Sequence, residues 1–229
     1  MLYSILFNSQ NNPKEAIIMF LIGIIVFFVS LSLHEFAHGL AAYKMGDITP
    51  KVQGRLTLNP IKHLDSTGFI CFILFCFGWA KPIQINPLNF KKYKKGCRIV
   101  SIVGVLTNVL LGLIAAGIYA VLMSTVGVSG EAMYYVYILL SSFMLINSYL
   151  ALFNLIPLFP LDGYNFLVTF FKKANKFTHF NERNGNKVLI GLILVSLVFE
   201  ILFNFDVLGW YLSLLYDHVF TRIALLGIL

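Results

Sequence analysis

Two histidines and a glutamate near the start of the chain have the spacing of a zinc site. In His34-Glu35-Phe36-Ala37-His38 the histidines are four residues apart, so on a helix both project from one face and can bind one zinc ion. Glu35 stands beside the first histidine, where a carboxylate can act as general base toward a water that zinc polarises. The spacing predicts metal-dependent hydrolysis. The alternative is a pair of buried structural histidines.

This motif lies at the end of a stretch that belongs in a membrane. Residues 17–33 are almost wholly apolar, and the 229-residue chain is 59% hydrophobic, only 12% charged and has a mean hydropathy of +0.83. Soluble domains are about half apolar and about a quarter charged, so we predict an integral membrane protein. Its net charge of +7 then reflects loops facing anionic lipid rather than a nucleic-acid partner. Ionisable side chains at membrane depth are costly and usually functional.

The apolar stretches predict an all-α polytopic membrane protein with about five to six membrane helices. A spanning helix needs about 20 apolar residues. Five stretches approach or exceed that length, namely residues 16–43, 98–126, 132–158, 187–204 and 207–229. A sixth, residues 67–80, is too short. No repeat or separate soluble region interrupts them, so we expect one domain over residues 1–229.

Two polar segments between the apolar stretches predict a small membrane-associated β element. Residues 52–58 partly alternate between apolar and polar, and residues 81–87 carry Pro82 and Pro87, which exclude helix, around an alternating Ile83 and Ile85. Two irregular loops are the alternative.

A catalytic zinc needs a third protein ligand, and Asp162 is the acidic residue best placed to supply it. It follows a long apolar stretch that Pro157 and Pro160 break, and Gly163 allows a close backbone approach. A carboxylate at a helix break inside a membrane is well placed to bind metal. A loop aspartate that caps the next helix is the other interpretation.

Several motifs together resemble the site-2 protease family of intramembrane zinc metalloproteases. The HExxH motif is followed by Asn154-x-x-Pro157-x-x-Pro160-Leu161-Asp162-Gly163. Residues 54–60 and 77–82 also resemble compact prokaryotic members. Residues 104–108, Gly-Val-Leu-Thr-Asn, resemble the family's Gly-Pro-x-x-Asn with valine in place of proline. The likeness covers about residues 16–170 and leaves the C-terminal helices, about residues 187–229, outside it.

The resemblance implies specific roles. One zinc per chain is expected on His34, His38 and Asp162, with Glu35 as catalytic base and Asn154 near the reacting carbonyl. The expected reaction is hydrolysis of peptide bonds within or near transmembrane segments, and regulated intramembrane proteolysis can require a prior cut by another protease. The expected partners are transmembrane substrates and the lipid bilayer of the cell membrane. A core without PDZ-like or CBS-like domain is also implied.

The proposed ligands constrain the topology. His34 and His38 lie near the end of the first helix and Asp162 follows the 132–158 helix, so the two helices must run in the same direction to share one zinc. We therefore expect residues 67–80 to enter and return as a re-entrant segment, or the proline-rich segment that follows them to bring the chain back. Of 17 lysines and arginines, ten lie in residues 44–98 and five in residues 172–187. By the positive-inside rule both regions are cytoplasmic, which places the zinc toward the cytoplasmic side.

Two other functions use the same residues. Glu35, Asp162 and the histidines would also suit a polar relay in a transporter or ion-conducting bundle. A catalytically silent relative that binds helices is a further alternative. Asn108 either packs between helices through a hydrogen bond or lies beside the site.

Overall fold

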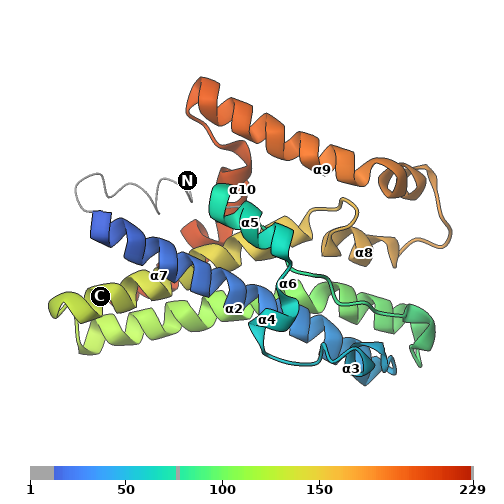
Figure 1. The fold of residues 1–229 in the computed structure, drawn as a ribbon, viewed down its shortest axis with the longest axis horizontal. Coiled ribbons are helices and arrows are strands. Elements are labelled where there is room, and N and C mark those ends of the chain that lie inside the picture. The colour runs from blue at the N-terminus through green and yellow to red at the C-terminus, as the bar shows by residue number, and fades with distance from the viewer. Residues whose placement is uncertain (1–12, 76–77, 228–229) are drawn as a thin grey trace.

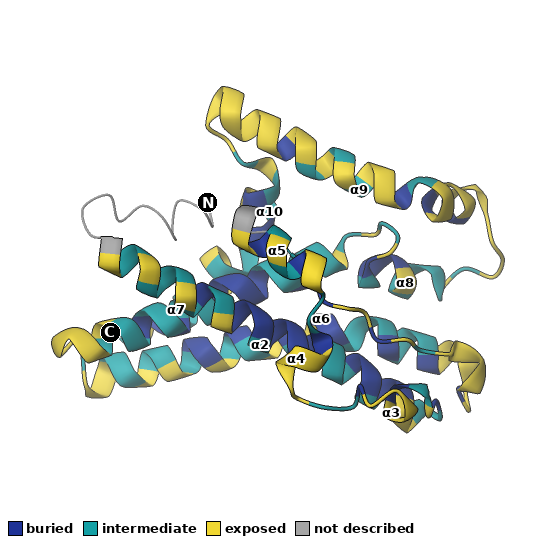
Figure 2. Cartoon of the chain, in the orientation of Figure 1, coloured by how far each residue is buried: buried dark blue, intermediate teal, exposed yellow. Residues whose placement is uncertain are grey.

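Three long helices pack together and form the core of the molecule. The computed structural model describes residues 13–75 and 78–227 (Figure 1). α2 (Pro13–Met45), α6 (Tyr93–Thr125) and α7 (Gly130–Leu155) bury their facing sides (Figure 2). The buried positions of α6 include the small residues Gly104, Gly112, Ala115 and Ala116, which allow helix backbones to approach closely in a membrane.

Four helices of the described chain are long and apolar enough to cross a membrane: α2, α6, α7 and α9 (Lys176–Phe203). The α-helical membrane fold is therefore confirmed, but a count of five to six spanning helices is not. α9 is largely exposed along its apolar part (Figure 2), as expected for a surface that contacts lipid.

The last apolar stretch, predicted as one element over residues 207–229, is divided into three. It forms α10 (Val207–Leu215), the π-helical turn η2 (Tyr216–Phe220) and α11 (Thr221–Leu225). Ser148 of α7 explains the π turn, because its hydroxyl donates to Leu212 O at 2.7 Å and accepts from Tyr216 N at 3.1 Å. These two backbone groups would bond to each other in a regular α-helix, and a side chain inserted between them widens the turn.

α2 and α7 run in the same direction, as the proposed ligands require. Met19, early in α2, shares a small cavity with Tyr134 and Tyr137, early in α7. Further along, the Ser30 hydroxyl accepts a hydrogen bond from Asn147 Nδ2 at 2.9 Å. Early residues of α2 thus lie near early residues of α7, and later residues lie near later ones, so the two helices are parallel. α6 runs in the opposite direction and packs against both (Figure 1).

The short segment between the polar loops turns back on itself, as the predicted re-entry requires. Its helix, α5 (Ser66–Phe75), has only 10 residues. Leu64 and Ala80, on either side of the segment, form an antiparallel bridge, and Lys81 N donates to His63 O at 2.9 Å. Residues 76–77, within the predicted segment, lie outside the described residues.

The predicted β element is not confirmed. Among the described residues the bridge between Leu64 and Ala80 is isolated and no strand forms. The polar region that was not expected to be helical contains the short helices α3 (Thr49–Val52) and α4 (Pro60–His63), each begun by a proline in its first turn. Residues 81–86, predicted to be extended, form neither helix nor strand, and the 3₁₀ turn η1 (Pro87–Asn89) follows them.

Side chains rather than a strand ladder join the two polar segments. Asp47 is fully buried and accepts hydrogen bonds from Asn86 N at 2.7 Å and Asn89 Nδ2 at 2.8 Å. Burial would raise the pKa of Asp47, but the hydrogen bonds from Thr49, Asn89 and Asn86 outweigh it and lower that pKa. Arg55 donates to Lys81 O at 2.6 Å. The carboxylate and the guanidinium thus satisfy backbone groups that a β ladder would otherwise pair.

The joining of the two polar segments predicts which side of the membrane each segment faces. Lys51 and Lys91 are both exposed and belong to the two joined segments, so cysteines placed at these positions should face the same side of the membrane. Membrane-impermeant maleimide applied to intact cells and to inside-out vesicles, after replacement of the three native cysteines, should label both positions from one side only. Labelling of Lys51→Cys and Lys91→Cys from opposite sides would show that residues 67–80 cross.

Candidate metal centre

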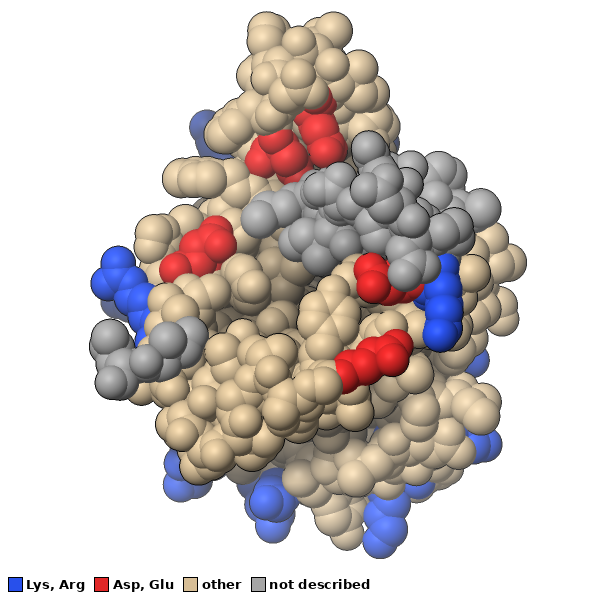
Figure 3. All heavy atoms as spheres, turned by 90° about the vertical axis from the view of Figure 1, so that its left-hand side faces the viewer, with Lys and Arg blue, Asp and Glu red and all other residues tan. Residues whose placement is uncertain are grey.

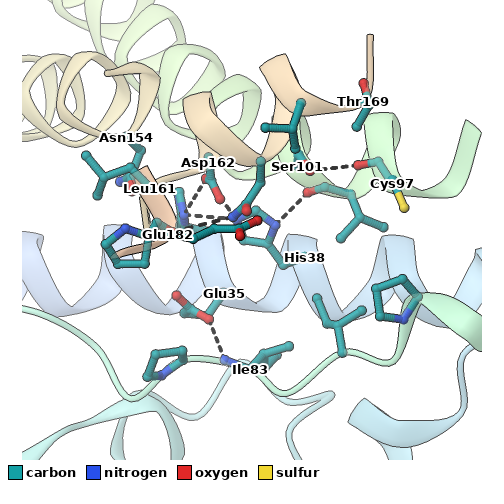
Figure 4. A pocket seen from close by; sticks show the side chains of 18 of the residues that line it. Glu35, His38, Ile83, Cys97, Ser101, Asn154, Leu161, Asp162, Thr169 and Glu182 are labelled. Atoms are coloured by element: carbon teal, nitrogen blue, oxygen red, sulfur yellow. Dashed lines mark hydrogen bonds and ion pairs between the residues drawn. The ribbon is translucent and has the colours of Figure 1, made fainter. Parts of the chain in front are cut away.

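Three potential metal ligands meet inside the helix bundle, where α2, α6 and the chain after α7 lie together. Nε2 of His34 lies 3.0 Å from Nε2 of His38, and Oδ2 of Asp162 lies 3.3 Å and 3.1 Å from these two nitrogens. Both imidazoles are buried and the Asp162 side chain is only 14% exposed. Among the described residues, these three form a group that could hold a metal ion. Figure 4 shows Asp162 beside His38.

The donor set and its spacing suit zinc. Two imidazole nitrogens and a carboxylate oxygen are common zinc donors, and ligand atoms about 2.0–2.1 Å from a tetrahedral zinc lie about 3.3 Å apart. Gly104 of α6 leaves the room that this arrangement requires. A Cβ at this position would collide with Nε2 of His38 and would lie 2.6 Å from Nε2 of His34.

A backbone carbonyl determines the tautomer of His38. Nδ1 of His38 lies 2.7 Å from Val100 O, and because a carbonyl only accepts, Nδ1 must carry the proton. Nε2 of the neutral ring then presents its lone pair toward Asp162 and His34, as a metal ligand needs. Val100 was not singled out in the sequence, since a main-chain acceptor leaves no signal in residue types.

The loop between α7 and α8 (Asp162–Val168) delivers the carboxylate. α7 ends at Leu155, and Asp162 is the first residue of α8. A Cβ on Gly163 would collide with Leu155 O, so glycine is required where the chain passes close to the helix it has just left. This close approach brings Oδ2 of Asp162 within 3.3 Å of both Nε2 atoms, where it can supply an oxygen ligand.

The start of α9 supports this loop from the other side. Asn181, which is buried, accepts a hydrogen bond from Phe159 N at 3.4 Å. A Cβ on Gly185 would lie 2.6 Å from Phe159 O, so α9 packs directly on the loop backbone. Asn181 and Gly185 are four residues apart and share a helix face, but the sequence does not reveal what that face contacts.

Glu35 points away from the three ligands toward the extended segment. Its Oε2 accepts a hydrogen bond from Ile83 N at 3.0 Å (Figure 4). The Ile83 side chain is buried, and a Cβ on Gly39 would lie 2.8 Å from its Cδ1. The proposed base is therefore hydrogen-bonded to the segment that the sequence predicted to be extended. Residue spacing did not reveal this contact.

One cavity of about 850 Å³ contains all of these groups. Its walls include His34, Glu35, His38 and Asp162 together with Pro82, Ile83 and Ile85. Asn154 also lines it, and the Asn154 amide nitrogen donates to Leu150 O at 2.9 Å. The structure thus places every proposed site residue at one cavity. Glu182 of α9, which the sequence analysis did not single out, lines the same cavity (Figure 4).

Two known proteins are similar in sequence to this chain. "Putative zinc metalloprotease YwhC" of Bacillus subtilis is 44% identical over 146 residues, which cover 63% of this chain and 66% of the relative. "Putative zinc metalloprotease Rip2" of Mycolicibacterium smegmatis is 27% identical over 163 residues, or 68% of this chain and 59% of the relative. The matched regions thus span just under two thirds of either relative. No family model and no solved structure matches the chain.

The fold and the site define a helical membrane protein with a metal site of two histidines and one carboxylate. Its relatives carry the names of zinc metalloproteases, and its motifs occur in the order expected from the sequence. The chain belongs to the site-2 protease family.

The close approach of α6 to the histidines predicts that Gly104→Ala weakens metal binding. The added methyl group collides with both imidazoles, and relieving the collision must separate α6 from α2, so zinc affinity should fall at least about tenfold, with about 1–3 kcal/mol of overpacking cost. Gly117→Ala is the matched control on the same helix, because its Cβ meets nothing within 4 Å. Chelator competition on purified protein measures both affinities, and unchanged affinity in Gly104→Ala would contradict the packing.

Proposed function

We propose that the protein is an intramembrane zinc endopeptidase that hydrolyses peptide bonds within or near transmembrane segments of other membrane proteins. The observation that carries the proposal is the common cavity of Glu35 and the three clustered ligand atoms of His34, His38 and Asp162. It lies beside helices long enough to span a membrane. A base next to a metal site that opens to a cavity is the arrangement that peptide hydrolysis requires.

The residues have separate roles in this reaction. His34, His38 and Asp162 would hold one zinc, which supplies Lewis acidity toward a peptide carbonyl and a water molecule. Glu35 takes a proton from the attacking water and passes it to the leaving amine. Asn154 donates a hydrogen bond to the oxygen on which negative charge develops, a contact often worth a few kcal/mol. This role requires its amide nitrogen to leave Leu150 O.

A transmembrane substrate must unwind before its backbone can react, because a helix already pairs its own carbonyl groups. Residues 81–86 form neither helix nor strand, and Pro82, Ile83 and Ile85 of this segment line the cavity. We propose that the unwound substrate pairs with this segment by β-augmentation. Ile83 N, which donates to Glu35, would then place the paired strand directly beside the base.

The charges support a location in the cell membrane with the site toward the cytoplasm. Lys94, Lys172 and Lys173 line the cavity that contains the metal ligands, so both basic regions of the sequence lie at the same end. The other end bears Glu15 and Glu131 at the starts of α2 and α7, and Figure 3 shows acidic side chains there with basic ones mostly at the rim. The positive-inside rule favours this orientation.

The proposed base predicts that Glu35→Gln abolishes cleavage and leaves zinc bound. General-base catalysis contributes about 10²–10⁴-fold, while Glu35 is not one of the three clustered ligands. The measurement is co-expression with a library of tagged single-span proteins, with wild type and Glu35→Gln compared, together with zinc content by mass spectrometry.

The outcomes separate the proposed function from its alternatives. Zinc near one per chain with cleavage only in the wild type supports the protease. Protein without zinc that conducts ions would favour a transporter, and zinc without cleavage of any tagged protein would favour a silent helix-binding relative.

Substrate pairing predicts that proline in the extended segment reduces cleavage without reducing zinc content. Ile85→Pro removes one N–H donor, so kcat/KM should fall about five- to tenfold, the equivalent of about 1 kcal/mol. Ile83→Pro also removes the donor to Glu35 and should cost more. Ile85→Ala keeps the N–H and is the control. Parallel losses of zinc and cleavage would show that the segment is only scaffold.

A further inference from the structure

One buried polar side chain of α6, one helical turn beyond Gly104, has no hydrogen-bond partner in the described part of the chain. Asn108 of α6 is fully buried, and neither Oδ1 nor Nδ2 has a hydrogen-bond partner among the described residues. Nδ1 of His34 is buried and unpartnered as well. Buried polar groups are nearly always hydrogen-bonded, and each exception calls for an explanation. The unpartnered groups of Asn108 and His34 lie on neighbouring helices, so one explanation can account for both.

The contrast with His38 shows what His34 lacks. A metal-binding histidine normally donates its second ring N–H to an acceptor, which fixes the tautomer and the ring orientation. His38 does so through Val100 O at 2.7 Å. His34 would need a comparable acceptor for its Nδ1.

The helix register indicates where this acceptor lies. α6 runs antiparallel to α2, with Val100 against His38 and Gly104 against both imidazoles. One turn back along α2, from His38 to His34, therefore corresponds to one turn forward along α6. Asn108 is one turn beyond Gly104 and lies on the same helix face. It is the polar side chain of α6 at the level where Nδ1 of His34 needs a partner.

We propose that Asn108 is a positioning residue for the metal site. Its amide oxygen accepts a hydrogen bond from Nδ1–H of His34, directly after a rotation of the amide or through one buried water. The contact keeps the proton on Nδ1 and turns the Nε2 lone pair toward His38 and Asp162. This inference rests on the proposed function, since it assigns Asn108 to the zinc site of that function. Packing of Asn108 between helices, without a role at the metal, is the alternative.

The test compares zinc affinities of the full-length chain purified in detergent. Asn108→Leu keeps a similar volume but removes the acceptor, and its affinity should fall about 10- to 100-fold. Asn108→Asp keeps an acceptor and should stay within a few-fold of the wild type. Thr107→Val is the matched control on α6, because the Thr107 hydroxyl donates to Val103 O of its own helix. Chelator competition gives the affinities, and the visible spectrum of the cobalt form reports ligand geometry.

Two further measurements keep the outcomes distinct. Thermal unfolding of the metal-free variants shows whether each folds, and Asn108→Ala, which has no side-chain acceptor, replaces Asn108→Leu if the latter does not fold. Its affinity should fall similarly. Wild-type affinity and an unchanged cobalt spectrum in the folded Leu or Ala variant would overturn the proposal while leaving the proposed function intact. A wild-type chain that binds no zinc would instead overturn the proposed function, and the inference with it.

Discussion

The contact of the Asp162 carboxylate with His34 and His38 is the constraint on which the rest of the structure depends. It joins residues 124 positions apart in the sequence, at the ends of two helices that must therefore run in the same direction. Consecutive membrane helices alternate in direction, so one segment between them has to return without crossing. The short α5 and the bridge between Leu64 and Ala80 provide this return. The topology is thus a consequence of the site.

Close packing and backbone hydrogen bonds then make the buried polar site tolerable. Where no solvent reaches, each polar group needs a partner from the protein. Val100 O accepts a hydrogen bond from His38, and Ile83 N donates one to Glu35. Glycines at 104 and 163 remove the Cβ atoms that would keep the helices apart. The site therefore combines α2, α6, the α7–α8 loop and the extended segment, and none of these elements forms it alone.

The sequence predicted the metal-ligand residues of this protein better than it predicted the structure of the polar loops. The HExxH motif, the helix break before Asp162 and the long apolar stretches depend on local spacing and composition, and the structure brings the predicted ligands together. The β element was not confirmed because alternation over residues 52–58 is too short to specify pairing. Asp47 and Arg55 instead bind the backbone groups of the facing segment. The final stretch was predicted as one element because its composition is uniform, and Ser148 of another helix interrupts it.

The sequence by itself determined that this is a helical membrane protein with a zinc-type donor set, since hydropathy and the spacing of two histidines act within single helices. It also determined the parallel direction of α2 and α7, once Asp162 was taken as the third ligand. Only the tertiary structure decided what surrounds those ligands. The acceptor of His38 is a main-chain carbonyl, the partner of Glu35 is a main-chain N–H, and the surroundings of Asn108 come from other helices. Such partners have no residue type of their own, so no pattern in the sequence could reveal them.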